Sequence, residues 1–139
     1  MEEKLTVRVA TADDLAGVSV FLQPFVDQKF ILPRTSVEIE LLLRNAFIAE
    51  AAGQIAGFAA VEIYSKKLAE IQCLAVSKDF RRQGIGKELV NRCVECAKAE
   101  KVREVMAITA TEQLFQECGF EFALPGQKRA VFIQTDDDD

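Results

Sequence analysis

The feature that most constrains the fold is a strand, a glycine-containing loop and a helix that follow one another directly. Leu74-Ala75-Val76 ends an apolar strand, and a basic turn then leads into Gly84-Ile85-Gly86-Lys87. Glycines let the backbone approach a ligand, and the start of a helix has unpaired N–H groups and a partial positive charge. The unit therefore predicts an anion site suited to a phosphate or pyrophosphate. The helix itself is expected from Gly84 to Glu100, because apolar residues recur there at helical spacing. They are Ile85, Leu89, Val90, Cys93, Val94 and Ala97.

Two well-known phosphate loops do not match this segment. A Walker A loop needs Ser or Thr after Gly-Lys, whereas Gly86-Lys87 is followed by Glu88. A dinucleotide loop needs a third glycine, where this chain has Leu89, and it follows the first strand of its unit rather than the fourth. A turn that only connects a strand to a helix has no use for several cations. This turn carries Lys78, Arg81, Arg82 and Lys87.

The remaining segments predict a sheet with helices. Two helices are expected between the first two strands, one capped by Thr11 and one by Ser36, and a short helix at 111–118 ends at Gly119. The order β-αα-βββ-α-β-α-ββ indicates an α/β (α+β) fold with a mixed sheet, antiparallel in its early hairpin and parallel across the later helix. Strands are expected at 5–10, 46–51, 55–64, 68–76, 102–108, 120–123 and 129–134.

Length and charge limit the classes of protein to be considered. The 139 residues are enough for a single domain, expected at 1–135, followed by an acidic tail of four aspartates at 136–139. Without that tail the chain has 17 basic and 18 acidic residues, and such a neutral body predicts no nucleic-acid partner. The absence of histidine excludes Ser-His-Asp and Cys-His catalysis. The chemistry must come from carboxylates, hydroxyls, thiols, backbone dipoles or a cofactor.

Apolar stretches and cysteines bear on the compartment and on metals. No stretch reaches the roughly 18–20 apolar residues of a membrane span, and no apolar signal region follows the first four residues. We therefore expect a cytoplasmic protein without a membrane partner.

Cys93 and Cys96 form a CxxC, but no second pair and no histidine accompany them, so we expect these cysteines to pack in the core and to bind no metal. Exposed edge strands are compatible with a homodimer.

At the glycine loop the chain resembles the GNAT superfamily of N-acetyltransferases. The acetyl-CoA signature of that superfamily is Arg or Gln, two residues, Gly, one residue, and Gly or Ala. It reads here Arg81-Arg82-Gln83-Gly84-Ile85-Gly86, and Leu114–Phe120 is similar to a late element of the same fold. The resemblance implies a mostly antiparallel central sheet with helices on both faces, and acetyl-CoA as cosubstrate. The residues it assigns to the cosubstrate are Leu74, Ala75, Val76, Arg81, Arg82, Gln83, Gly84, Ile85, Gly86 and Lys87.

Residues 31–132 resemble, more narrowly, the acetyltransferase domain of bacterial N-acetylglutamate synthases. The likeness rests on Leu32-Pro33-Arg34-Thr35-Ser36, on the strand from Glu70 to Val76, and on the segment from Phe115 to Phe120. It implies that Glu70 is the general base, that Thr111 is the general acid, and that Arg34 binds the carboxylate of the acceptor. Those synthases continue into a basic C-terminal segment, whereas this chain ends in aspartates. The acceptor is therefore expected to be a small amine, with glutamate as one candidate amino acid.

Each assigned side chain also has a purely structural interpretation. Glu70 could pair with Lys67 at the strand edge, Thr111 could cap the last helix, and Arg34 could pair with Glu38. These alternatives remain open at the level of sequence.

The sequence as a whole predicts an acetyl-CoA-dependent N-acetyltransferase that uses direct attack by the amine. Two other classes are retained, a non-catalytic acyl-CoA-binding regulatory module and a protein or peptide N-acetyltransferase. Phe115 occupies the helix in which many relatives have a proton-donating Tyr, so Thr109 and Tyr64 are further hydroxyl candidates for the general acid.

Overall fold

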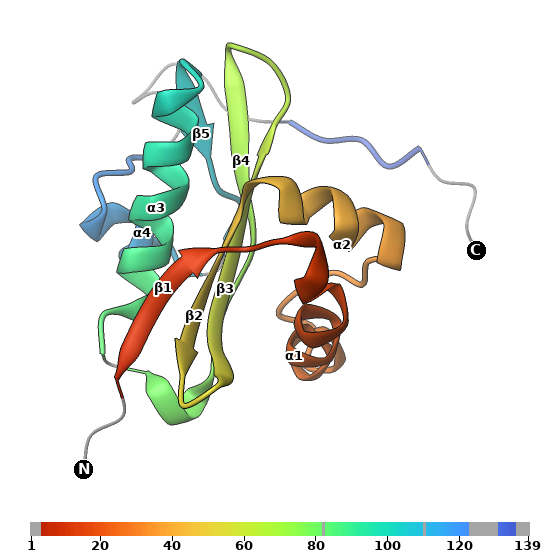
Figure 1. Cartoon of the computed structure of the whole chain (residues 1–139). Helices are drawn as coiled ribbons and strands as arrows, with labels where there is room; N and C mark the ends of the chain where they lie inside the picture. Colours follow the sequence, from red (N-terminus) through yellow and green to blue (C-terminus); the bar gives the residue numbers. More distant parts are fainter. Residues whose placement is uncertain (1–3, 82, 110, 123–130, 136–139) are drawn as a thin grey trace.

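A five-stranded sheet with the order β1-β2-β3-β4-β5 forms the centre of the molecule (Figure 1). The computed structural model describes residues 4–81, 83–109, 111–122 and 131–135. Neighbouring strands are antiparallel except for β4 and β5, which are parallel and joined through a helix. The mixed, mostly antiparallel sheet predicted from the sequence is confirmed. The strands are β1 (Leu5–Val9), β2 (Ala46–Ala51), β3 (Gln54–Ile63), β4 (Leu68–Val76) and β5 (Glu104–Met106).

Helices cover both faces of the sheet and divide the core into two parts. Figure 1 shows α1 and α2 on one side of the strands and α3 and α4 on the other. Leu89, Val90 and Cys93 of α3 are fully buried against one face, and Val18 and Leu22 of α1 against the other. Within the described residues, no helix combines the length and the apolar character needed to cross a membrane. The helices are α1 (Leu15–Asp27), α2 (Ser36–Leu42), α3 (Ile85–Ala99) and α4 (Glu112–Glu117).

Side-chain caps fix where the first two helices begin. Thr11 caps a short 3-10 turn that runs directly into α1, and the Thr11 backbone N–H donates to Asp14 at 2.8 Å. The second cap is Thr35 and not Ser36, because the Thr35 hydroxyl accepts from the Glu38 N–H while the Glu38 carboxylate accepts from the Thr35 N–H at 2.7 Å. Such a reciprocal capping box requires Glu three residues after the cap, a spacing that only Thr35 satisfies here.

Strand β4 contains a bulge that reverses which face its side chains occupy. Cys73 and Leu74 lie opposite the single residue Ala59, and Cys73 has a φ of 59°. Every second residue of β4 is buried, a regular alternation that would normally indicate one buried face along the whole strand. Ile71, before the bulge, packs under α3, whereas Ala75, after it, packs under α1 and α2. An extra residue shifts the two-residue alternation by one position, which produces this change of face.

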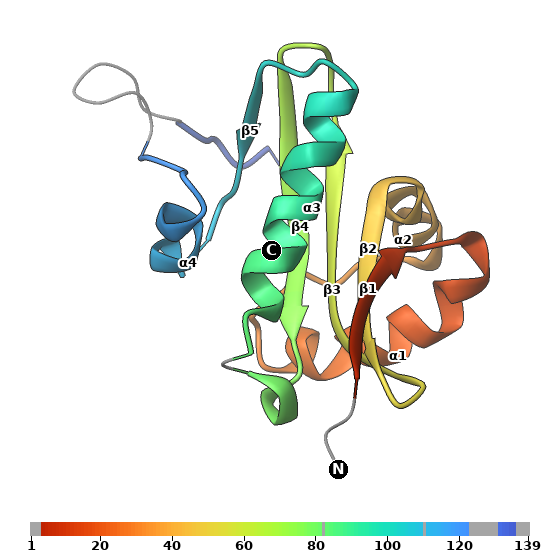
Figure 2. The same ribbon diagram turned by 60° about the vertical axis from the view of Figure 1, so that its left-hand side comes forward.

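The sheet opens on the β5 side of β4. The parallel pairing consists of three residue pairs and ends at Glu70 opposite Met106. Figure 2 shows the chain after β5 leading away from β4 toward α4. The predicted strand at 102–108 is therefore shorter than expected, and residues 71–76 have no partner strand on this side within the described part of the chain.

The two predicted closing strands are not present in the described part of the chain. Residues 120–122 and 131–135 are irregular, and the rest of both predicted strands, 123–130, lies outside the described residues. Val131, Phe132 and Ile133 are between 74% and 89% exposed. Alternating apolar residues form a strand only where a neighbouring strand and a buried face are available, and among the described residues neither adjoins 131–135.

Candidate active site

The backbone forms one side of the site, where β4 leads into α3. Gly84 is the N-cap of α3 and has a φ of 78°, a left-handed conformation that glycine adopts without strain. This turn exposes the unpaired N–H groups of the first helical residues, Ile85, Gly86 and Lys87. The helix start faces the end of β4, whose edge is unpaired beyond Glu70 in the described structure. The predicted anion site and a free strand edge are therefore neighbours.

Two glycines bring helices close to this loop. A Cβ atom at Gly57 of β3 would meet Ile85 and Leu89 side chains at 3.0 Å, so glycine allows α3 to lie directly on the sheet. A Cβ atom at Gly86 would meet Leu114 of α4 at 3.2 Å. From the sequence, Gly86 was expected to allow the approach of a ligand, and no role was predicted for Gly57. Both positions also have a packing role.

The basic side chains of the loop do not act as one group. Arg81 donates from Nε to the carbonyl of Val76 at 3.4 Å, which places its guanidinium at the end of β4. The Lys87 ammonium pairs with Glu117 of α4 at 2.8 Å. Lys78 and Gln83 are exposed, and Arg82 lies outside the described residues. The side chain of Lys87 thus links α3 to α4, and only the backbone of Lys87 faces the loop.

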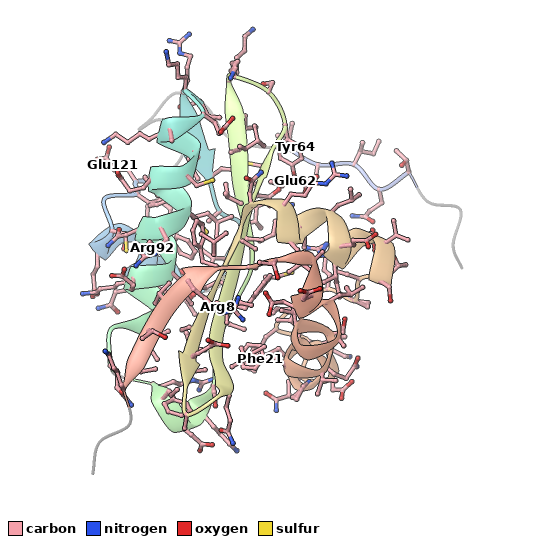
Figure 3. All side chains as sticks on the ribbon, viewed as in Figure 1. Arg8, Phe21, Glu62, Tyr64, Arg92 and Glu121 are labelled. Atoms are coloured by element: carbon pink, nitrogen blue, oxygen red, sulfur yellow. The ribbon has the colours of Figure 1, made fainter. Side chains whose placement is uncertain are left out.

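Four polar side chains meet on the α2 face of the sheet, near the ends of β3 and β4. We call Glu62, Tyr64, Glu70 and Gln72 the β3–β4 polar cluster. The Tyr64 hydroxyl donates to Glu70 Oε1 at 2.6 Å, and Gln72 Nε2 donates to Glu62 at 2.5 Å and to the Tyr64 oxygen at 3.1 Å. Figure 3 shows Glu62 and Tyr64 on this side of the strands. The cluster lies where the β4–β5 pairing ends.

Burial, and then the hydrogen bond to Glu70, raise the pKa of the Tyr64 hydroxyl above its usual value. Tyr64 therefore remains a protonated donor at neutral pH. Among the described residues Glu70 forms no ion pair with Lys67, so that structural interpretation of Glu70 is not supported. From the sequence, Tyr64 was expected only as a further hydroxyl candidate for the general acid. The signal that was available is the two-residue spacing of Glu62 and Tyr64 and of Glu70 and Gln72 on adjacent antiparallel strands.

Arg34 lies beside the bulge of β4. Burial raises the pKa of the Cys73 thiol, and the nearby Arg34 guanidinium opposes that effect. Cys73 is thus a protonated, buried thiol at neutral pH rather than a nucleophile. Glu38 is engaged in the α2 cap, and no Arg34–Glu38 ion pair is present in the described part of the chain. Arg34 Nε is buried and has no hydrogen-bond partner there.

Two hollows adjoin Arg34. One, of about 260 Å³, lies between α1 and α2 and includes Ser19, Gln23 and Ser36. The other, of about 450 Å³, lies between α2 and strands β3 and β4 and includes Glu62 and Gln72 of the polar cluster. The second hollow has the size of a small-molecule site. Arg34 therefore lies near Cys73 and lines the same hollow as Glu62 and Gln72 of the polar cluster.

Thr111 occupies the N-cap position of α4 but does not cap it through its side chain. Its hydroxyl instead pairs with the Thr109 hydroxyl at 2.9 Å, and Thr109 accepts from the Thr111 N–H at 2.8 Å. Both threonines are exposed. The capping interpretation of the Thr111 side chain is therefore wrong, and the two candidate hydroxyls form one pair.

Comparison with known proteins agrees with this geometry. The family model for the acetyltransferase (GNAT) domain matches residues 43–122. An uncharacterized N-acetyltransferase from Chlorobaculum tepidum is 33% identical over 115 residues, which are 83% of this chain and 74% of that protein. An amino-acid acetyltransferase from Pasteurella multocida is 30% identical over 93% of this chain and 31% of that protein. The structure of N-acetylglutamate synthase from Neisseria gonorrhoeae with coenzyme A and N-acetyl-glutamate matches with a TM-score of 0.78 and 26% identity, over 88% of this chain and 30% of that one.

Fold, loop and relatives together define an acyltransferase. More narrowly, the chain belongs to the GNAT acetyltransferase family, whose domain model covers more than half of its length. The chain spans about a third of the length of the Pasteurella and Neisseria proteins. The family and fold expected from the glycine loop are confirmed, and the roles of individual site residues stay predictions.

Proposed function

We propose that this chain transfers the acetyl group of acetyl-CoA to the amine of a small molecule, an amino acid such as glutamate being the leading candidate. The observation that carries the proposal is the opening of β4 beyond Glu70, because it leads into the start of α3 on one side and adjoins the β3–β4 polar cluster on the other. A donor and an acceptor that approach from these two sides meet at the same strand.

The chain offers acetyl-CoA two kinds of contact. The unpaired backbone of Leu74 and Val76 can bind the extended pantetheine arm as an added strand would. Backbone N–H groups from Gln83 to Lys87 can bind the pyrophosphate, with support from the dipole of α3. Arg81, at the end of β4, is placed to bind a phosphate of the adenosine part. When bound, acetyl-CoA supplies the acetyl group as an activated thioester.

Acetyl transfer requires a neutral amine, stabilisation of the thioester oxygen and a proton for the departing thiolate. Glu70 would remove a proton from the acceptor ammonium, directly or through a water molecule. The amine nitrogen then bonds to the carbonyl carbon while the carbon–sulfur bond breaks. A backbone N–H at the Leu74 bulge would stabilise the oxygen. A hydroxyl of the Thr109–Thr111 pair would give its proton to the departing sulfur and regain one from the nitrogen, which loses its second proton as the amide forms.

Arg34 is the proposed ligand of an acceptor carboxylate. It lines the hollow that contains Glu62 and Gln72, and it makes no ion pair among the described residues. Arg34 is partly buried and its Nε has no hydrogen-bond partner among the described residues, so an anionic ligand that satisfies this group would be favoured. An amino acid would bind with its carboxylate at Arg34 and its amine toward Glu70.

The first test is a mass-spectrometric acetylation screen with acetyl-CoA against all twenty amino acids, polyamines and a peptide library. A product with glutamate or aspartate is expected. A product only with a basic amine or a peptide would overturn the acidic amino-acid acceptor and retain the transferase. Binding of acetyl-CoA without any product would favour a non-catalytic acyl-CoA-binding module.

The second test is Glu70→Gln, which keeps the shape of the side chain and removes its basicity. General-base catalysis contributes roughly 10²–10⁴-fold, so turnover should fall by about that factor while the acetyl-CoA Kd stays constant. Glu104→Gln on β5 is the matched control, because Glu104 is an exposed carboxylate of the same sheet outside the cluster. Unchanged turnover in Glu70→Gln would remove Glu70 as the base.

A further inference from the structure

We infer that Tyr64 is a positioning residue for Glu70: its hydroxyl holds one carboxylate oxygen of Glu70 and leaves the other oxygen free for the acceptor amine or a relay water. This inference rests on the proposed function, in which Glu70 is the base. It differs from a proton-donor role for Tyr64, because the tyrosine acts through Glu70 and not on the substrate.

The need for positioning arises from two carboxylates on adjacent strands. Glu62 of β3 and Glu70 of β4 are direct partners across the antiparallel ladder. Like charges in this arrangement repel one another and destabilise the pair. Without donors between them, the two side chains would turn apart, and Glu70 would have no fixed orientation at the opening of β4.

Tyr64 and Gln72 supply these donors. Gln72 Nε2 donates to Glu62 at 2.5 Å and to the Tyr64 oxygen at 3.1 Å, and the Tyr64 hydroxyl donates to Glu70 Oε1 at 2.6 Å. The Gln72 amide also lies 3.5 Å from the same Oε1 atom. Glu70 Oε2 accepts no hydrogen bond from the described residues. The network therefore selects one oxygen as anchored and one as available.

Tyr64 is suited to this role because it remains a donor. Burial and the Glu70 carboxylate raise the pKa of its hydroxyl, so it stays protonated at neutral and acidic pH. Glu62 is the charged neighbour on β3, and Arg34, Glu38 and Arg44 line the adjacent hollow from the α2 side. Among the described residues neither Arg34 nor Arg44 forms an ion pair with Glu70. Of the two side chains that donate to Glu70, Tyr64 at 2.6 Å is much closer than Gln72 at 3.5 Å.

Tyr64→Phe tests the inference by removing only the hydroxyl. Tyr64 is 50% exposed as a residue, so the variant should fold, and thermal unfolding checks this. A hydroxyl donor favours the ionised carboxylate. The Glu70 carboxyl resonance, followed by ¹³C NMR and assigned by its loss in Glu70→Gln, should therefore titrate at higher pH in Tyr64→Phe than in the wild type. This titration needs no acceptor. Thr6→Val, which removes an exposed hydroxyl from β1, is the control and should leave it unchanged.

Kinetics with acetyl-CoA and L-glutamate give an independent measure. Loss of a hydrogen bond to a charged group should lower kcat roughly tenfold and move the acidic limb of the pH–rate profile upward, with an unchanged acetyl-CoA Kd. In the Glu70→Gln background, Tyr64→Phe should have no further effect.

The possible failures are distinguishable. If Glu70→Gln keeps wild-type turnover, Glu70 is not the base, and both the proposed mechanism and the positioning role are overturned. If Glu70→Gln is inactive while Tyr64→Phe leaves the carboxyl titration unchanged, only the positioning role is overturned. Additive losses in the double variant would likewise overturn the positioning role and leave Glu70 as the base.

Discussion

The two sides of the opening in β4 are built from different parts of the chain. The side that leads into α3 consists of backbone groups that are close in sequence, residues 74–81 and 83–87, with Gly84 in a left-handed conformation. The side that faces α2 consists of side chains from β3, β4 and the segment before α2, held by hydrogen bonds such as Tyr64 to Glu70. One side depends on backbone shape and the other on the identity of individual side chains.

This difference suggests how the two sides tolerate change. Backbone N–H groups are present in nearly every residue, so a backbone site is lost only when a substitution alters the conformation or fills the space. A side-chain site is lost when a single functional group is removed. This arrangement suits a constant acetyl donor on the backbone side and an acceptor that differs between enzymes on the side-chain side. Four predictions test the comparison, from the largest expected effect to the smallest.

Gly86→Glu should have the largest effect, on the backbone side. The new side chain meets Leu114 and brings a negative charge to the start of α3. Each charge-assisted hydrogen bond contributes roughly 1.5–3 kcal/mol, so the loss of two should weaken acetyl-CoA binding about 100-fold or more by calorimetry. Gly17→Glu, at an exposed glycine of α1, is the matched control and should bind normally. Unchanged affinity in Gly86→Glu would refute the pyrophosphate site.

Arg34→Ala tests the side-chain side. Removing a guanidinium that binds a carboxylate should raise the KM of the acceptor amino acid roughly 10- to 100-fold, with the acetyl-CoA Kd within about twofold. Arg34→Lys should recover little, because an ammonium cannot form the paired contacts of a guanidinium. Arg92→Ala on α3, on the opposite face of the sheet, is the control. An equal change in the acetyl-CoA Kd would show that the two sides are not separate.

Gly84→Ala asks whether conformation matters apart from space. Nothing lies within 4 Å of a Cβ atom at Gly84, so the cost comes from a φ of 78°. An alanine in this conformation costs about 1 kcal/mol of unfolding free energy. Gly53→Ala in the β2–β3 turn, with a φ of 76° and equally open space, should cost the same in a denaturant titration. Only Gly84→Ala should also weaken acetyl-CoA binding, by a few-fold, and equal affinities in both variants would contradict the role of this turn.

Asp14→Asn should change stability and neither side of the site. Hydrogen bonds from Arg8 lower the pKa of Asp14 from 3.8 to about 2. A carboxylate whose pKa is lowered by folding stabilises the folded state at any pH above its pKa in the unfolded chain, which is 3.8 for Asp14. That contribution disappears as the pH falls toward about 2, the pKa in the folded state. Since Arg8 is partly exposed, the loss at pH 7 should be about 1 kcal/mol of unfolding free energy after screening by water. A difference between variant and wild type that stays constant from pH 7 to pH 2 would contradict this assignment.

The continuous segments of the fold could be predicted because their signals are local. Five of the six apolar residues of the stripe from Ile85 to Ala97 are buried as expected, and Val94 is partly buried. The hairpin of β2 and β3 turns at Ala52 and Gly53. The face reversal within β4 could not be predicted, because a bulge leaves the alternation of buried residues unchanged in the sequence. The prediction of two closing strands was wrong over residues 120–122 and 131–135. The alternation of apolar and polar residues does not reveal whether a partner strand is present.

The residues of the candidate site likewise divide into those that the sequence could predict and those that it could not. The glycine loop was predicted because its residues are neighbours in sequence, and the resemblance assigned Glu70, Thr111 and Arg34 by their positions in motifs. Tyr64 was undervalued, because its contact with Glu70 depends on the register of two strands. The pairing of Thr109 with Thr111 depends on backbone geometry that the capping preference did not indicate.

The sequence by itself determined the family, the order of the elements and the loop in which α3 begins. Each of these depends on residues that are close together in the sequence, where the spacing of apolar residues and glycines determines the local structure. The tertiary structure alone decided that β4 changes face at Cys73 and that its edge is free beyond Glu70 in the described part of the chain. It also decided that Tyr64 holds Glu70 in a cluster whose members Glu62 and Gln72 line the larger hollow. These features arise from strand register and helix packing, which bring together residues that the sequence keeps apart.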